Sequence, residues 1–197
     1  MQILYQDIVL VGSFNSSLFS PEWMKKKSIY EGEVGVEFEL GTGNLRFLLK
    51  KVELYLSVSQ NKILIQNANN LESFKSNKFS FLVQLLKILP HTPVSAIGYN
   101  IHLNIPKIKR DTLTDLMKEN FIKLKVNDKT IQSQFLYQIR KDYLITINYQ
   151  LSDQSPELVH FNFEDRAIPN SELGHQSVQK FISKIEEFNK YASSHLE

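Results

Sequence analysis

The stretch that decides the fold runs from Phe74 to Ile105 and reads FKSNKFSFLVQLLKILP-HTP-VSAIGYNIHLNI. Its first part has apolar residues at the i, i+3, i+4, i+7 spacing of an amphipathic helix, which Pro90 and Pro93 end. From Val94 the period changes to two, which predicts a long strand with one apolar face and one face that is small and then polar. The sequence therefore predicts a core helix followed at once by a core strand.

The chain before this stretch predicts a strand, a short helix, further strands and then the helix just described. Ser20 as N-cap, followed by Pro21 and Glu22, marks the start of the short helix. The run from Leu45 to Ser59 is long for one strand and is read either as two strands broken near Lys50 or as one bent strand. The expected elements are a strand over Ile3–Val11, a helix over Pro21–Lys27, strands over Val34–Leu40, Leu45–Ser59 and Lys62–Asn67, and a helix over Phe74–Leu89.

The chain after this stretch repeats the same order of elements. A short helix is expected from Asp111 or Thr112 to Glu119. Strands are then expected, followed by one final helix with an apolar stripe that includes Val178 and Phe188. The expected strands are Phe121–Val126, Ile131–Arg140, Tyr143–Leu151 and Glu157–Asp165.

These elements predict an α+β protein that forms a single compact unit over residues 1–197. We expect an antiparallel sheet with two long helices on one face. Two similar β-α-β(3-4)-α halves, 1–90 and 94–195, would form one continuous curved sheet. The element order resembles the saddle of the TATA-binding-protein class, although no sequence motif of that class is present. The resemblance concerns the order of elements only and implies nothing about function.

Composition narrows the classes of protein further. The 197 residues are 42% hydrophobic and 22% charged, which is typical of a globular chain. A formal charge of +2 gives little support for a polyanionic partner, and the absence of cysteine excludes disulfides and thiolate chemistry. No apolar run approaches the roughly 20 residues that span a bilayer. We expect a cytoplasmic protein that needs no membrane.

The segment from Phe14 to Trp23, FNSSLFSPEW, is unusually aromatic for an irregular segment. Phe14, Phe19 and Trp23 can fold back onto the core, or they can anchor an interface, where aromatic residues are enriched. Both readings stay open at the level of sequence.

A second candidate surface is the polar face of the sheet, opposite the helices. Amide side chains both donate and accept hydrogen bonds, so such a face suits a peptide, a nucleic acid or a second copy of the chain. The members assigned to this face from the alternating pattern are Asn100, His102, Gln132, Gln134, Gln138, Arg140, Thr146, Asn148, Gln150, His160 and Asn162.

Two other classes of function rest on smaller sets of residues. If the strands of His102 and His160 are neighbours, these histidines and Glu164 could form a hydrolytic or metal site, although no metal-binding spacing supports it. The basic segments 25–27 and 107–110 could contact nucleic acid, but they lack interleaved aromatic residues. We therefore predict a binding or interaction protein without catalytic residues, cofactor or metal. A protein partner or self-association, such as a homodimer, is expected, with nucleic acid as the weaker alternative.

Overall fold

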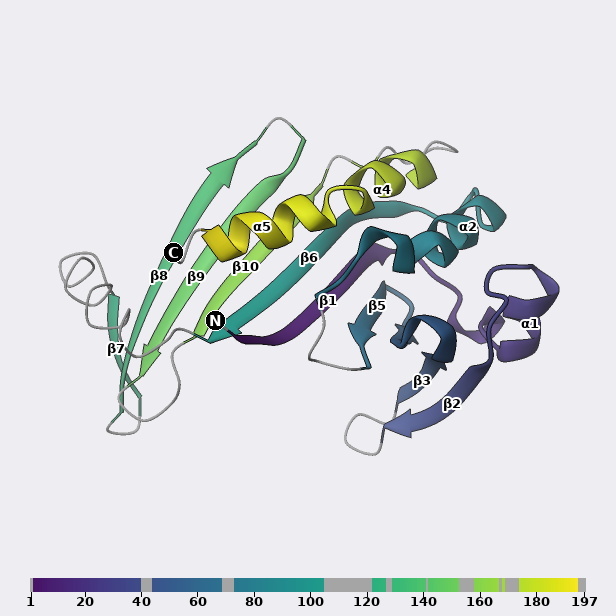
Figure 1. Cartoon of the computed structure of the whole chain (residues 1–197), viewed down its shortest axis with the longest axis horizontal. Helices are drawn as coiled ribbons and strands as arrows, with labels where there is room; N and C mark the ends of the chain where they lie inside the picture. The colour runs from purple at the N-terminus through teal and green to yellow at the C-terminus, as the bar shows by residue number, and fades with distance from the viewer. Residues whose placement is uncertain are drawn as a thin grey trace.

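The computed structural model describes residues 2–39, 44–68, 73–104, 122–126, 129–140, 142–152, 158–166, 168 and 174–194. Within this part of the chain, ten strands form one antiparallel sheet in the order β2-β3-β4-β5-β1-β6-β10-β9-β8-β7 (Figure 1). The predicted α+β class with a single large antiparallel sheet is therefore confirmed.

Alternating apolar residues form the strands, and short polar connections separate them. The predicted long run after Leu45 is two strands, because a 3-10 turn at Lys50–Val52 and a left-handed Glu53 (φ 54°) break it. The strands are β1 (Gln2–Gly12), β2 (Val34–Glu39), β3 (Asn44–Leu49), β4 (Leu54–Val58), β5 (Lys62–Asn67), β6 (Val94–Asn104), β7 (Ile122–Val126), β8 (Lys129–Ile139), β9 (Leu144–Ser152) and β10 (Leu158–Asp165).

The two strands that open the predicted halves lie together in the middle of the sheet. β1 and β6 pair antiparallel, with Asp7 opposite Asn100. β5 flanks β1 on one side, and β10 flanks β6 on the other. From this central pair the strand numbers run outward in the same way on both sides. The division of the chain into two similar halves remains a prediction.

Helices α2, α4 and α5 lie on one face of the sheet (Figure 1). The predicted final helix is two helices, because Lys184 N bonds to Phe181 O and tightens the chain between them. The helix of residues 74–89 begins as a 3-10 turn at Ser76–Phe79 (η3). The predicted short helix over 111–119 lies outside the described residues. The helices are α1 (Pro21–Lys26), α2 (Ser80–Ile88), α4 (Gly174–Ile182) and α5 (Ile185–Ser194).

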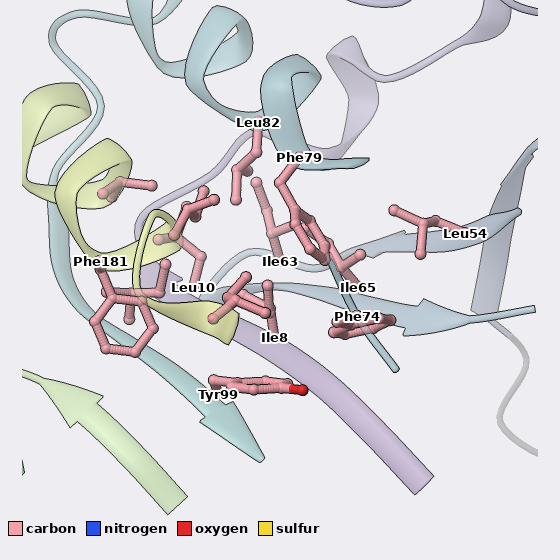
Figure 2. Packing of buried hydrophobic residues seen from close by; sticks show 14 of the residues in the cluster. Ile8, Leu10, Leu54, Ile63, Ile65, Phe74, Phe79, Leu82, Tyr99 and Phe181 are labelled. Atoms are coloured by element: carbon pink, nitrogen blue, oxygen red, sulfur yellow. The ribbon is translucent and has the colours of Figure 1, made fainter. Parts of the chain in front are cut away.

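The core lies between this helical layer and the sheet. Figure 2 shows side chains of this core: Ile8 and Leu10 on β1 and Ile63 and Ile65 on β5 belong to one buried cluster with Leu82, Phe74 and Phe79. Along the middle of the central strands the residues that face the helices are buried, such as Ile8 and Leu10 on β1 and Tyr99 and Ile101 on β6, as a sheet with one covered face requires. Phe74 is 0% exposed although it precedes the helix, because its ring stacks on Tyr99 with centroids 5.8 Å apart.

A buried polar network fastens α5 to the central strands. Gln6 on β1 donates to the Tyr99 hydroxyl at 2.6 Å and accepts from the Phe74 N–H at 3.0 Å. Asn189 on α5 accepts from Tyr99 at 2.7 Å and donates to the Phe74 carbonyl at 2.9 Å. These bonds satisfy polar groups that would otherwise be costly to bury. They join four segments that are distant in sequence.

Among the described residues, no helix has both the length and the apolar character needed to cross a lipid bilayer.

Candidate functional site

The face of the sheet away from α2, α4 and α5 is called the open face here. Strand alternation places on it a row of polar residues that crosses the middle of the sheet, because residues directly opposite in an antiparallel pair share a face. In strand order this polar row consists of Arg46, Tyr55, Gln66, Tyr5, Asp7, Asn100, His102, His160, Asn162, Thr146 and Asn148.

The centre of the polar row is a chain of hydrogen bonds across three strands. Asn100 on β6 donates from Nδ2 to Asp7 Oδ1 on β1 at 2.6 Å. The Asn100 Oδ1 atom lies 2.9 Å from His160 Nε2 on β10. Asp7 is 7% exposed, so this carboxyl group is held almost out of water. Burial raises the pKa of Asp7, while hydrogen bonds from Asn100 and Tyr5 partly oppose that rise.

These contacts determine which ring nitrogen of His160 carries the proton. Because the Asn100 amide nitrogen donates to Asp7, the oxygen of the same amide is the acceptor that faces His160. The Nε2 atom of His160 must then carry the proton and donate it to that oxygen. In the neutral ring the Nδ1 atom keeps its lone pair, so His160 can accept a hydrogen bond at Nδ1.

His102 and His160 lie against each other at the centre of the polar row. Their rings stack with centroids 4.2 Å apart and planes within 8°. Tyr5 meets the edge of His102 at 5.4 Å, and Gln66 donates to the Tyr5 hydroxyl. Burial lowers the pKa of His102, and burial together with the charge of His102 lowers the pKa of His160 to about 4. Both rings are therefore neutral at pH 7.

We expect the fold to lose stability as the pH falls from about 6.5 to about 4. The unfolded chain takes up a proton on residue 160 near the ordinary histidine pKa of about 6.5, whereas the folded chain does so only near 4. Protonation therefore favours the unfolded state within this window, and the full contribution is present above it. The lowered pKa corresponds to about 3 kcal/mol at most. Urea unfolding at a series of pH values measures it.

A matched pair of variants isolates this effect. His160→Asn should reduce the dependence on pH between about 6.5 and 4, because one of the two buried histidines is gone while His102 remains. Gln176→Asn, at an exposed position of α4 and without a titrating group, should leave the dependence as it is. The raised pKa of Asp7 acts in the opposite direction, since the folded chain takes up that proton first as the pH falls. Equal pH dependence in His160→Asn and the parent chain would contradict the account.

The geometry does not assemble the predicted His/His/Glu site. Two imidazoles bind one metal through lone pairs that lie in their ring planes, and these lone pairs cannot converge when the rings are stacked in parallel. Glu164 follows Asn162 by two residues on β10 and lies opposite Gly98 on β6. Its carboxylate forms an ion pair with Arg166 at 2.8 Å. Among the described residues no group of three or more potential metal ligands comes together. The two histidines are neighbours as predicted, but Glu164 is not part of their cluster.

The predicted members Gln132, Gln134 and Gln138 lie on β8, which pairs antiparallel with β9. In this register Gln132 is opposite Leu151, Gln134 is opposite Tyr149 and Gln138 is opposite Ile145. Their membership of the polar face remains a prediction.

The aromatic segment 14–23 folds back onto the core. Phe14 is 4% and Phe19 7% exposed, and both belong to the buried cluster. Trp23 packs against this cluster and against Phe19, with ring centroids 5.3 Å apart. Phe14 and Phe19 are therefore part of the core, whereas Trp23 is half-buried. An interface role for this segment remains a prediction.

Arg140 lies apart from the polar row, at the β8–β9 turn. It is exposed and lines a cavity of about 550 Å³ with Asp142, Arg166, Lys180 and Lys184. Asp142 is held by Lys184 at 3.0 Å and Lys180 at 3.3 Å, and these hydrogen bonds lower its pKa. The charges of this cavity are thus largely paired with one another. The basic segment 107–110 lies outside the described residues.

Sequence reasoning missed Tyr5, Asp7 and Gln66 as members of the site. The available signal was a carboxylate inside an otherwise apolar strand, since Asp7 interrupts the run ILYQDIVLV. An acidic side chain in such a run needs a hydrogen-bonding partner on a neighbouring strand. The identity of that partner depends on strand order, which joins β1 to β6 across more than ninety positions.

Neither a protein-family model nor a curated protein matches the chain. Among solved structures, it is similar to a rolling circle replication initiator protein from Geobacillus stearothermophilus, with 12% sequence identity and a TM-score of 0.36. The match covers 93% of this chain and 79% of that one. At this identity and score, the likeness supports no conclusion about the fold or the function of this chain.

Proposed function

We propose that this chain is a non-catalytic binding protein that holds a protein partner on the open face of its sheet. The observation that carries the proposal is the polar row, which is half-buried and built mainly of amides, histidines and tyrosines. An exposed sheet face that only meets water ordinarily carries mobile charged side chains. Here the central side chains are instead fixed by one another, as a preorganised binding surface requires.

Hydrogen-bonding capacity is left over at the centre of this row. The Oδ1 atom of Asn162 is shielded from solvent and has no hydrogen-bond partner among the described residues. His160 offers its Nδ1 lone pair, because Nε2 is used toward Asn100. A docked partner does not reach an atom that solvent does not reach, so the proposed partner supplies its donor, such as a backbone N–H group, at His160 Nδ1 and not at the Asn162 oxygen.

The charges of the open face favour a protein over a nucleic acid. Asp7, Glu37 and Glu164 lie on it, and Arg46 is engaged by Glu37 at 2.8 Å. A polyanion needs a surplus of free basic side chains along its path, and these acidic groups repel it. A fluorescence polarisation titration with an oligonucleotide should therefore show no salt-dependent binding. Tight binding that weakens steeply with salt would favour the nucleic-acid alternative instead.

The test is a quantitative pull-down from nuclease-treated lysate of the source cells, with two variants as baits. Thr146→Arg places a long cation on the open face beside Asn162, its register partner on β10. Ser193→Arg adds the same side chain at an exposed position on α5, on the helical side. We expect Thr146→Arg to recover the specific partner at least about tenfold less than the parent chain does, because a buried unpaired charge is costly at an interface.

Ser193→Arg is expected to recover the partner as the parent chain does. Circular dichroism and a urea titration confirm that both baits are folded. Equal recovery by the two variants would contradict the proposal, and so would a parent chain that recovers no specific partner.

A further inference from the structure

The edge strand β2 has features that would allow another strand to pair with it. It lies at one end of the sheet and pairs with β3 in regular register from Val34 to Glu39. Exposed edges are usually protected from pairing by charged side chains, especially lysine, by proline or by a bulge. The sequence of β2, VGVEFE, has neither lysine nor proline, its register is unbroken, and its charged residues are Glu37 and Glu39.

Among the described residues no strand pairs with the outer edge of β2, and its outward backbone groups can be assigned residue by residue. Lys50 N donates to Glu33 O at 3.1 Å, so Glu33 and Lys50 form a hydrogen-bonded pair next to the strand. Such pairs alternate along an antiparallel ladder, so Gly35 and Glu37 also use their backbone groups toward β3. The N–H and C=O groups of Val34, Val36 and Phe38 therefore point away from the sheet.

The same end of the sheet carries an exposed apolar patch. Val36 is 52%, Phe38 59% and Leu45 53% exposed. Phe38 and Leu45 are register partners, and Val36 follows two positions before Phe38, so all three share the helical face of the sheet. Large exposed apolar residues gathered at one place mark an interaction surface.

We propose that two copies of this chain pair antiparallel along β2 and form a two-fold symmetric dimer with one continuous sheet. The two faces of the joined sheet are continuous only when even-numbered residues of one copy lie opposite even-numbered residues of the other. The register that uses the outward backbone groups of Val34, Val36 and Phe38 places Val36 opposite Val36 of the second copy. Val34 then lies opposite Phe38 in both directions. Each of these pairs is of the hydrogen-bonded kind, and its side chains lie on the apolar patch.

The strand is also compatible with itself in charge. In this register Glu37 lies opposite Gly35, which leaves room for it, and not opposite a second Glu37. Arg46 neutralises Glu37 within its own chain at 2.8 Å. At each end of the paired segment Glu33 lies opposite Glu39 of the second copy, and the repulsion of this like-charge pair is opposed by Lys50, which forms an ion pair with Glu33. This self-complementarity favours a second copy over an unrelated extended peptide as the occupant.

The symmetry of this pairing has a consequence for the open face. Equal-parity antiparallel pairing requires a two-fold axis perpendicular to the sheet, so both helical layers lie on one side. The open faces of the two copies then lie side by side on the other side. The dimer does not depend on the proposed partner, but it would offer that partner two polar rows on one surface.

Sedimentation of the full chain over a concentration series, together with cysteine cross-linking, tests the dimer. The parent chain should sediment with twice its 22.9 kDa mass. Phe38→Lys should weaken self-association at least about tenfold, because a cation then enters the apolar patch. Leu18→Lys, at a position 40% exposed in the 3-10 turn Ser16–Leu18, is the matched control and should not change it.

The register is tested by disulfide formation, since the chain has no cysteine of its own. Opposite residues of a hydrogen-bonded pair have Cα atoms about 5.5 Å apart, within reach of a disulfide. Val36→Cys should therefore cross-link efficiently under mild oxidation, whereas Leu18→Cys should not. A parent chain that stays monomeric at all concentrations overturns the proposal. So does a monomer that binds an extended peptide at β2, or cross-linking at position 36 no better than at position 18.

Discussion

Phe188→Ala is expected to lower the free energy of unfolding by about 3–5 kcal/mol, the range for truncating a buried phenylalanine. The ring is 0% exposed and stacks on Phe163 with centroids 4.5 Å apart and planes within 13°. Tyr143 meets it edge-on at 4.9 Å, and Phe181 lies 5.2 Å away. Removing it opens a cavity between α5 and the central strands. Urea unfolding followed by circular dichroism measures the change.

Leu18→Ala is the control for Phe188→Ala. Leu18 is 40% exposed in the 3-10 turn Ser16–Leu18, so its truncation should change the free energy of unfolding by no more than about 0.5 kcal/mol. Similar losses in the two variants would mean that α5 is not packed on the sheet as described.

Gln6→Leu is expected to cost about 2–4 kcal/mol, although it replaces a polar group in the core by an apolar one. The side chain is 2% exposed and holds both the Tyr99 hydroxyl and the Phe74 N–H. Leucine leaves that N–H buried without an acceptor, which costs about 1–3 kcal/mol by itself. Hydrogen exchange at the Phe74 amide should become faster, which reports the lost bond directly.

Gln176→Leu, at an exposed position of α4, is the control for Gln6→Leu. It should leave both the free energy of unfolding and the exchange at Phe74 unchanged. The double variant with Asn189→Leu should show a smaller loss than the two single losses added together, because both side chains belong to one network. Strict additivity would contradict the network.

The sequence predicts the elements of this fold well where side-chain period decides them. The alternation from Val94 to Asn104 predicts β6, and the serine cap before Pro21 predicts α1, whose Ser20 side chain accepts from the Trp23 N–H at 3.1 Å. Both signals are local, and each depends on chemistry within a few residues. Local signals of this kind survive folding because the tertiary structure agrees with them.

The site is harder to predict from the sequence than the elements are, because it depends on strand register and strand order. The partner of each β8 residue depends on the length of the β8–β9 connection, and a change of one residue there would pair Gln134 with a neighbour of Tyr149 instead. The contacts among Asp7, Asn100 and His160 depend on β1 and β10 flanking β6, which no local pattern specifies. From the sequence, His102 and His160 could be predicted to lie together only if their two strands were assumed to be neighbours.

The most direct test of the central claim, that the open face holds a partner, is the ratio of partner recovered by Thr146→Arg to that recovered by Ser193→Arg. The two baits carry the same added cation and differ in the face of the molecule that carries it. We predict a ratio of about one tenth or less. A ratio near one, with both baits folded, would contradict the claim.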